Sequence, residues 1–262
     1  KKDITFSGSR VYDGTTTVSS FDLVTNDTTS GETLTFSGSG TVSSANVQNN
    51  QSITLGSIAI ADGSGGGLAS NYNLTTGTFD ISQKWVSVGG QKIYDATTTV
   101  SSSDLEVTGE VTGESISITG TGSVTDKNVG SGKTINISGL SLSDGSHSAS
   151  NYTIGTTSFA ITRRTLSISG EKVYDGTGTV LASQIDTVNT AGGETLTISG
   201  EGSVSLPSVG TNKSITLNTL GISNGTNGTI GLASNYTLNS GSFDITTKPI
   251  TLSGSRQYDG TT

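Results

Sequence analysis

The chain has 262 residues, of which 37 are glycine and none is cysteine, and its 13 basic and 21 acidic residues give a net charge of −8. The lack of cysteine excludes disulfides, thiolate metal sites and thiol catalysis, and the scattered acidic excess leaves no basic face for nucleic acid. No stretch approaches the roughly 18 apolar residues of a membrane span. Glycine at twice its usual share of about 7% favours short strands and turns.

One short motif occurs four times in the sequence. It reads Arg-Val-Tyr-Asp-Gly-Thr-Thr at residues 10–16, and close copies stand at 92–98, 172–177 and 257–262. The tyrosines of successive copies are 82, 80 and 84 residues apart, a period close to the length of a small all-β domain. The sequence therefore predicts three repeats, residues 1–83, 84–164 and 165–248, and the start of a fourth at 249–262.

Each repeat opens on a strand in which apolar and polar residues alternate, as in Ile-Thr-Phe-Ser at residues 4–7. Further strands are expected around residues 17–23 and 31–38, followed by a loop with a buried valine and a long strand over 52–60. The repeat closes on large apolar side chains at Tyr72, Leu74, Phe79 and Ile81. No segment shows the period of an amphipathic helix.

These patterns predict an all-β fold of tandem small antiparallel β-sandwiches, Ig-like in architecture, with β-grasp-like repeats or one continuous β-helix as alternatives. The apolar residues fall on odd-numbered positions at Phe79 and Ile81 and on even-numbered positions from Val86, so the buried face of the strand changes there, which marks a repeat boundary. The short connections there favour an extended rod. The expected core of the first repeat is Phe6, Tyr12, Leu34, Phe36, Ile53, Leu55, Tyr72, Phe79 and Ile81.

The recurring Tyr-Asp pair is interpreted as structural. The tyrosine ring should be buried, and the aspartate should accept backbone N–H bonds that fix the turn. Alanine replaces glycine at position 96, which argues that the position does not require a positive φ. A type I′ hairpin is therefore not expected. The pairs are Tyr12 with Asp13, Tyr94 with Asp95, Tyr174 with Asp175 and Tyr258 with Asp259.

A second recurring pair stands near the end of each repeat and joins asparagine to tyrosine. The asparagines are expected to bond loop backbone, and the pairs are Asn71 with Tyr72, Asn151 with Tyr152 and Asn235 with Tyr236. Calcium is the sharpest alternative for the recurring acids, although no Asp-x-Asp cluster is present and no cofactor is required. The calcium candidates are Asp13, Glu32, Asp95, Glu114, Asp175 and Glu194.

An enzyme is not expected. The single histidine, His147, lies in a polar loop with no counterpart in the other repeats, and nothing supplies a base for a serine or threonine nucleophile. The single tryptophan, Trp85, stands at the first repeat boundary and is expected to be partly buried there rather than to form a carbohydrate platform.

Four segments, which the second repeat carries most fully, together resemble a known family. They are Lys-Val-Tyr-Asp-Gly-Thr, as at 172–177, Asp-Lys-Asn-Val-Gly-Ser-Gly-Lys-Thr at 126–134, Ile-Ser-Gly-Leu-Ser-Leu at 137–142 and Asn-Tyr-Thr-Ile at 151–154. The combination is similar to the YDG repeat of large bacterial surface adhesins of the filamentous haemagglutinin type. The resemblance implies a secreted, cell-surface, repeat-built stalk without enzymatic activity.

The sequence thus predicts the stalk of an extracellular adhesin or surface fibre, which projects a binding region for adhesion or biofilm formation. Its expected partners are other repeats of the same chain, with neighbouring fibres or surface polysaccharide as further candidates. A glycan-binding repeat module is the alternative. Both ends of the chain fall at one phase of the array, which favours a window of a longer fibre in which residues 249–262 need a partner to become ordered.

Overall fold

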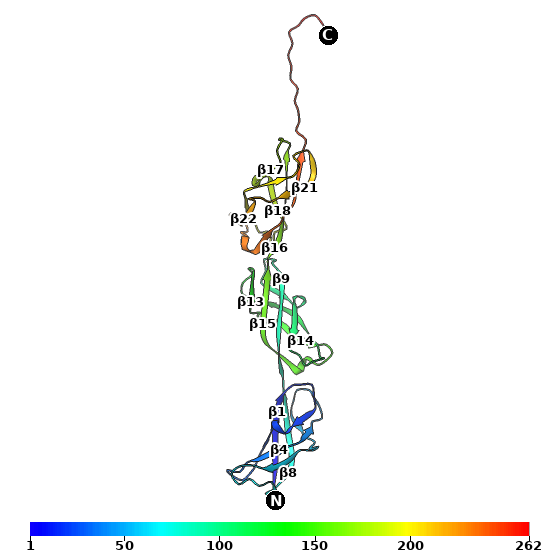
Figure 1. Ribbon diagram of the computed structural model, residues 1–262, viewed down its shortest axis with the longest axis vertical. Helices are drawn as coiled ribbons and strands as arrows, with labels where there is room; N and C mark the ends of the chain where they lie inside the picture. The colour runs from blue at the N-terminus through cyan, green and yellow to red at the C-terminus, as the bar shows by residue number, and fades with distance from the viewer. Residues whose placement is uncertain (262) are drawn as a thin grey trace. The chain divides into compact units, whose positions relative to one another are not determined.

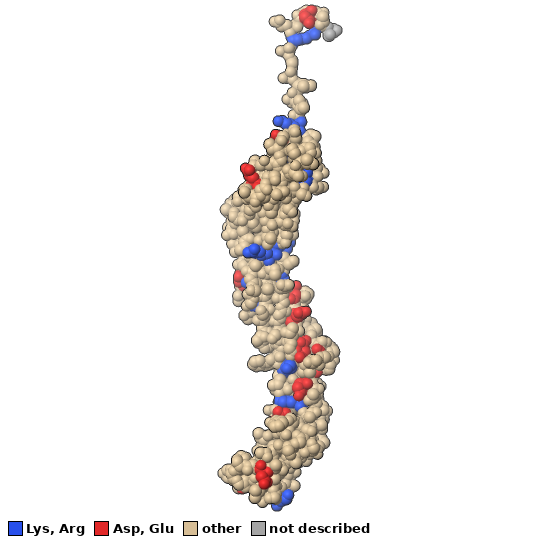
Figure 2. All heavy atoms as spheres, viewed as in Figure 1, with Lys and Arg blue, Asp and Glu red and all other residues tan. Residues whose placement is uncertain are grey.

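The computed structural model describes residues 1–261 and confirms an all-β fold (Figure 1). Its strands are joined by turns and by short 3-10 helices, and residues 1–261 contain no α-helix. In this described part no helix is long and apolar enough to cross a membrane. On the face drawn in Figure 2, charged side chains are scattered among uncharged ones.

Internal contacts divide the chain into two compact units, and each is built from three stretches of sequence. The first unit comprises Lys1–Gln91, Thr99–Thr125 and Gly132–Phe159. The second comprises Lys92–Thr98, Asp126–Ser131 and the chain from Ala160 onward. Three segments of the predicted second repeat, residues 92–98, 126–131 and 160–164, therefore group with the third repeat. The predicted repeat boundaries remain predictions.

The first repeat forms one four-stranded sheet, of order β3-β1-β8-β6, and two small ladders, β2-β5 and β4-β7. Its strands are β1 (Lys2–Val11), β2 (Thr17–Ser19), β3 (Leu23–Thr25), β4 (Leu34–Ser37), β5 (Ser39–Thr41), β6 (Gln48–Ser52), β7 (Ala59–Asp62) and β8 (Tyr72–Ser82). Its 3-10 helices are η1 (Ser20–Asp22) and η2 (Ala69–Asn71).

The second repeat forms sheets of order β11-β9-β15-β13 and β10-β12-β14. Its elements are β9 (Lys84–Ile93), β10 (Thr99–Ser101), η3 (Ser102–Asp104), β11 (Leu105–Thr108), β12 (Ile116–Ser123), β13 (Gly130–Lys133), β14 (Leu140–Asp144), η4 (Ala149–Asn151) and β15 (Tyr152–Thr162).

The third repeat forms a seven-stranded sheet, of order β17-β20-β21-β24-β16-β18 with β23 also paired to β16, and a β19-β22 ladder. Its elements are β16 (Arg164–Val173), β17 (Thr179–Leu181), η5 (Ala182–Gln184), β18 (Ile185–Val188), β19 (Leu196–Ser199), β20 (Glu201–Val204), β21 (Gly210–Thr216), β22 (Gly221–Asn224), η6 (Ala233–Asn235), β23 (Tyr236–Leu238) and β24 (Ser242–Thr246).

The sheets are small and mixed, so the prediction of purely antiparallel sandwiches is wrong. The first and last strands of the first repeat, β1 and β8, pair in parallel from Lys2↔Tyr72 to Val11↔Ser82. The corresponding strands of the third repeat, β16 and β24, also pair in parallel. Parallel pairing needs a crossover of a dozen or more residues, and the whole body of the repeat between the two strands supplies it.

The single long strand predicted over residues 52–60 is also wrong. Strand β6 ends at Ser52 and β7 begins at Ala59, and the two belong to different ladders. The chain turns between them, because Gly56 adopts a φ of 58° and the Ile58 N–H bonds to the Leu55 carbonyl at 2.8 Å. Glycine takes this left-handed conformation without steric cost, so Gly56 ends one strand and re-aims the next.

The core follows the alternation of the strands. Of the nine side chains predicted to be buried in the first repeat, six are buried, namely Phe6, Tyr12, Leu34, Tyr72, Phe79 and Ile81. The remaining three, Phe36, Ile53 and Leu55, are half-buried and pack against the cluster that contains Phe6 and Phe79.

The segment that follows β24 forms no strand among the described residues, although Ile-Thr-Leu at 250–252 has the pattern of β1. Ile250, Leu252 and Tyr258 are 85%, 95% and 92% exposed. In the first repeat β1 is held by β3 and β8 of its own repeat. Residues 249–261 pair with no such strands, and the last residue of this predicted stub, Thr262, lies outside the described residues.

Candidate functional site at the joints between repeats

The Tyr-Asp-Gly turn is fixed by its aspartate. Asp13 Oδ1 accepts hydrogen bonds from both the backbone N–H and the hydroxyl of Thr15, at 2.9 and 3.0 Å. Each later copy of the turn repeats this pair of bonds. The backbone bonds measure 2.9 Å for Thr97 to Asp95, 2.9 Å for Thr177 to Asp175 and 3.0 Å for Thr261 to Asp259.

A basic residue three positions before the aspartate closes the turn. Lys92 Nζ lies 2.9 Å from Asp95 Oδ1, and Lys172 Nζ lies 3.1 Å from Asp175 Oδ1. Burial raises the pKa of Asp95, but the hydrogen bonds from Lys92 and Thr97 outweigh it, so the net pKa is lowered. The backbone bond from Thr177, followed by the bond from Lys172, lowers the pKa of Asp175 to about 2. The turn is therefore held by charge-assisted bonds.

The residue after the aspartate has a positive φ in every copy, which corrects the interpretation drawn from alanine at position 96. Ala96 adopts a φ of 65°, and the glycines at the equivalent positions adopt 79° to 83°. A Cβ in this region crowds the following carbonyl oxygen. The surrounding hydrogen bonds hold Ala96 in this conformation despite the steric cost.

Ala96→Gly should raise the free energy of unfolding of the second unit by roughly 0.5–1 kcal/mol, because relief of the left-handed strain exceeds the entropy gained by the unfolded chain. Gly14→Ala should lower the stability of the first unit. A Cβ at Gly14, whose φ is 79°, would also lie 2.9 Å from Glu114 Oε1. Urea denaturation of the two variants checks whether the free energy of unfolding changes in opposite directions. A loss of stability with Ala96→Gly would contradict the claim that the backbone at Ala96 is strained.

The first joint, within the first unit, is a carboxylate shared by two tyrosines. Glu114 Oε1 accepts a 2.8 Å hydrogen bond from the hydroxyl of Tyr12, and Glu114 Oε2 accepts a 2.5 Å bond from Tyr152. The two rings pack edge to face with centroids 5.4 Å apart. Tyr12 belongs to the first predicted repeat, and the other two residues belong to the second. The tyrosine of one repeat is thus bound by the acid of the next.

The second joint, within the second unit, has the same arrangement around Glu194. Tyr94 and Tyr236 each donate a 2.7 Å hydrogen bond to this carboxylate, and their ring centroids are 5.4 Å apart. Lys127 Nζ adds an ion pair at 2.8 Å. Burial raises the pKa of Glu194, but the bonds from Lys127, Tyr94 and Tyr236 outweigh it, so the net pKa is lowered.

An asparagine clamp completes each joint. Asn151 Oδ1 accepts the backbone N–H of Val47 at 2.9 Å, and its amide donates to Asn46 Oδ1 at 2.9 Å. In the second joint the same atoms of Asn235 bond Val129 and Asn128 at 2.9 and 2.8 Å. The asparagines therefore bond the loop of the preceding repeat, a partner that the sequence did not indicate.

The short connections between repeats are also tied down. Only Gln83 separates β8 from β9, and its amide donates to the carbonyls of Ser150 and Tyr152 at 3.0 and 3.1 Å. Only Arg163 separates β15 from β16, and its Nε donates to the carbonyl of Ser234 at 3.1 Å. Each joint therefore has a fixed connection as well as side-chain bonds.

The calcium candidates do not meet in one place. The aspartates bond their own turns, whereas Glu114 and Glu194 accept tyrosine hydroxyls. Glu32 accepts a hydrogen bond from Tyr72. Across residues 1–261 no three His, Cys, Asp or Glu side chains are grouped so that they could hold a metal ion. His147 lies beside the first joint, with Nε2 3.9 Å from Glu114 Oε1.

The joint tyrosines should make the protein sensitive to alkali. Burial, followed by the hydrogen bonds to Glu114 and Glu194, raises the pKa values of Tyr12, Tyr152 and Tyr236 to about 12. A raised folded-state pKa stabilises fully below the unfolded value near 10, and this contribution is lost as the pH rises towards 12. The loss should reach up to roughly 3 kcal/mol for each tyrosine.

Urea denaturation between pH 8 and pH 12 checks this expectation. The free energy of unfolding should stay constant to about pH 9 and fall beyond pH 10. Tyr152→Phe should reduce the fall, because the variant has one fewer buried group to ionise. A free energy of unfolding that stays constant from pH 8 to pH 12 in the unaltered chain would show that folding does not hold these hydroxyls in the protonated form.

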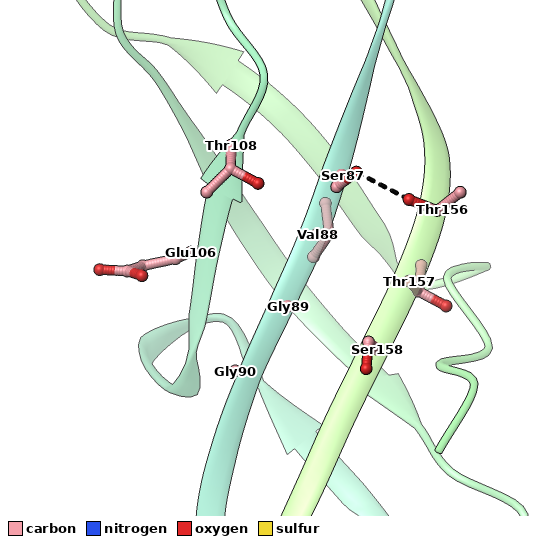
Figure 3. A pocket seen from close by; sticks show the side chains of 9 residues that line it. All are labelled: Ser87, Val88, Gly89, Gly90, Glu106, Thr108, Thr156, Thr157 and Ser158. Carbon is pink, nitrogen blue, oxygen red and sulfur yellow. Dashed lines mark hydrogen bonds between the residues drawn. The ribbon is translucent and has the colours of Figure 1, made fainter. Parts of the chain in front are cut away.

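A shallow hollow of about 380 Å³ lies on the outward face of the second repeat, within the first unit (Figure 3). Gly89 and Gly90 are among its lining residues, and hydroxyls of Ser87, Thr108 and Thr156 line it together with Glu106. The Ser87 and Thr156 hydroxyls bond one another at 2.7 Å, as the dashed line in Figure 3 shows.

Trp85 lies on β9 two residues before the hollow begins and is 76% exposed. The expectation that it would be partly buried at the repeat boundary is therefore wrong. Alternation explains the outcome, because Val86 and Val88 fill the inward positions of β9 and leave Trp85 on the outward face. Its side chain lies against Gly155, where an added Cβ would be 3.2 Å from Trp85 Cβ.

Small β-repeats that are joined in series through shared carboxylates define a tandem-repeat protein. A family model of the YDG domain matches residues 1–79, 83–159 and 161–243. These matches cover most of the chain, and the chain belongs to the YDG domain family. Neither a curated protein nor a solved structure was found to match it.

Proposed function

We propose that this chain is a load-bearing stalk region of a secreted bacterial adhesin or surface fibre, which projects a binding region for adhesion or biofilm formation at the cell surface. The observation that carries the proposal is the parallel pairing of the first and last strands within a repeat. In a parallel pair the chain enters at one end and leaves at the opposite end. The two ends of such a repeat therefore lie at opposite ends of its strand pair, as a repeat of a stalk requires.

The same pairing suits a chain under tension. A pull on the two ends of the first repeat loads the β1–β8 ladder in shear, so hydrogen bonds along about 30 Å of paired strand resist together. The single-residue connections and the shared carboxylates limit slack between repeats. The proposal assigns no chemical reaction to the chain, and its partners are further repeats, neighbouring fibres or surface polysaccharide.

Single-molecule force spectroscopy on the full chain tests the load-bearing role. The chain has no cysteine, so pairs of introduced cysteines define the points of pulling. Lys1→Cys with Gln83→Cys pulls β1 and β8 in shear, whereas Lys1→Cys with Ser70→Cys pulls at the same end of both strands and peels them apart. We expect a several-fold higher unfolding force in shear. Equal forces in the two geometries would contradict the proposal.

Glycan binding is a second candidate, favoured by the exposed Trp85 beside a hollow lined with hydroxyls and a carboxylate. An aromatic ring can stack on the apolar face of a sugar, and the polar groups can bond its hydroxyls. The other repeats supply matched variants. Thr165 stands in place of Trp85 in the third repeat, and Ser7 and Ser169 stand in place of Gly89.

An array of neutral and N-acetylated oligosaccharides tests this candidate. Trp85→Thr and Gly89→Ser should each reduce binding at least tenfold without loss of stability, because their side chains occur at the equivalent positions of the sibling repeats. No binding by the unaltered chain, or equal binding by these variants, would exclude the hollow as the site.

A further inference from the structure

One half of a joint is present but unfilled in the first repeat. Asn71 is exposed and its side chain makes no hydrogen bond within residues 1–261, whereas Asn151 and Asn235 are 1% and 0% exposed. Glu32 accepts a hydrogen bond from Tyr72 through Oε2, and its Oε1 accepts none within the same described residues. Glu32, Asn71 and Tyr72 are called here the incoming face.

The opposite half of a joint is unfilled in the third repeat. Tyr174 is 40% exposed, whereas Tyr12 and Tyr94 are 3% and 0% exposed. Val209, which corresponds to the clamped valines of the earlier loops, is 48% exposed. Tyr174 and Val209 are called the outgoing face.

Both faces already have the local structure of a filled joint. The Tyr72 hydroxyl accepts the N–H of Thr29 at 3.0 Å, as the Tyr152 hydroxyl accepts that of Val111 at 3.1 Å. The Tyr174 N–H bonds the carbonyl of Thr246 at 2.9 Å, as that of Tyr12 bonds Ser82 at the same distance. The missing contacts therefore need little rearrangement, which lowers the cost of binding.

We propose that the incoming face is a docking surface for the outgoing face of a further YDG repeat, joined ahead of residue 1. The tyrosine hydroxyl of the added repeat's outgoing face donates to Glu32 Oε1, and a backbone N–H of that repeat's valine loop donates to Asn71 Oδ1. Both contacts occur in the two filled joints. The inference rests on the serial joining of repeats and does not depend on the mechanical or adhesive role.

A covalently joined repeat fits the face better than a second copy of the chain. In both filled joints a single residue, Gln83 or Arg163, separates the last strand of one repeat from the first strand of the next. A separate copy continues from Thr246 into residues 247–261, so its own chain would stand where β1 of the first repeat has to begin. A joined repeat meets no such obstruction.

Hydrogen exchange on an extended chain tests the inference. A copy of residues 165–246 is placed directly before Lys1, so that Lys1 takes the place of Gln83. Exchange of the amides in residues 29–34 and 68–73 should slow at least tenfold relative to the chain without the addition. As the matched control, Tyr174→Phe in the added copy should remove much of this protection, because Phe lacks the hydroxyl that donates to Glu32.

A second extension guards against misfolding of the added repeat. Residues 84–162, whose outgoing face already fills a joint in this chain, are placed before Lys1 instead, and exchange within the added residues reports whether they fold. Unchanged exchange at residues 68–73 beside a folded added repeat would overturn the proposal. Protection that appears in the unextended chain as its concentration rises would assign the face to a second copy and would also overturn it.

Discussion

Glu194→Ala should lower the free energy of unfolding of the second unit by about 3–5 kcal/mol. The glutamate is 3% exposed and accepts hydrogen bonds from Tyr94 and Tyr236 in addition to its ion pair with Lys127. Its removal leaves two buried hydroxyls without an acceptor. Lys127 loses its carboxylate as well. Urea denaturation followed by circular dichroism measures the loss.

Glu32→Ala is the matched control, because Glu32 is half-buried and bonds one tyrosine in an unfilled joint. It should cost about 1 kcal/mol, the value of a typical hydrogen bond. Equal losses from the two substitutions would show that the joint adds nothing to the stability of the carboxylate site.

The same carboxylate should make the second unit sensitive to acid. The pKa of Glu194 is lowered in the folded protein, so its contribution to stability is present above the unfolded value near 4.3 and is lost as the pH falls through the lowered pKa. In Glu194→Gln this part of the acid dependence should disappear, because the amide does not titrate.

The sequence predicts much of the fold through two periodicities. The recurrence of Tyr-Asp every 80 to 84 residues gives the repeats, and the alternation in segments such as residues 4–7 gives the strands and most of the core. Alternation specifies which face of a strand is buried, but it is the same for either strand direction. The parallel β1–β8 pair was therefore beyond this kind of prediction.

The alanine at position 96 conceals the left-handed backbone of this turn from sequence-based prediction. Glycine recurs at the left-handed position of the turn, and its replacement by alanine at position 96 suggested an ordinary φ. Lys92 and Thr97 bond Asp95 from two sides and hold the turn closed. A cost on the order of 1 kcal/mol is thus tolerated where several hydrogen bonds fix the conformation.

The joints were hidden by distance along the chain. Tyr12 and Glu114 are 102 residues apart, and the glutamate that recurs in the same repeat as Tyr12 is Glu32. The sequence shows that tyrosine, glutamate and asparagine recur together, which was the available signal. It does not show that the tyrosine of one repeat bonds the glutamate of the next.

Tyr72→Ala should lower the free energy of unfolding of the first unit by roughly 3–5 kcal/mol, as expected for a large-to-small change in a core. Tyr72 is 3% exposed and packs in one cluster with Ile4 and Leu34. The cluster joins side chains of β1, β4 and β8, so the substitution should weaken the β1–β8 ladder that the stalk proposal requires.

Tyr72→Phe separates the ring from the hydroxyl. Phenylalanine keeps the packing but loses the bonds to Thr29 and Glu32, so it should cost about 1–2 kcal/mol. Thermal and urea denaturation of the two variants give the comparison. Packing carries the stability of this cluster if alanine costs at least twice as much as phenylalanine, whereas equal losses would assign it to the hydrogen bonds that hold Glu32 ready for an incoming tyrosine.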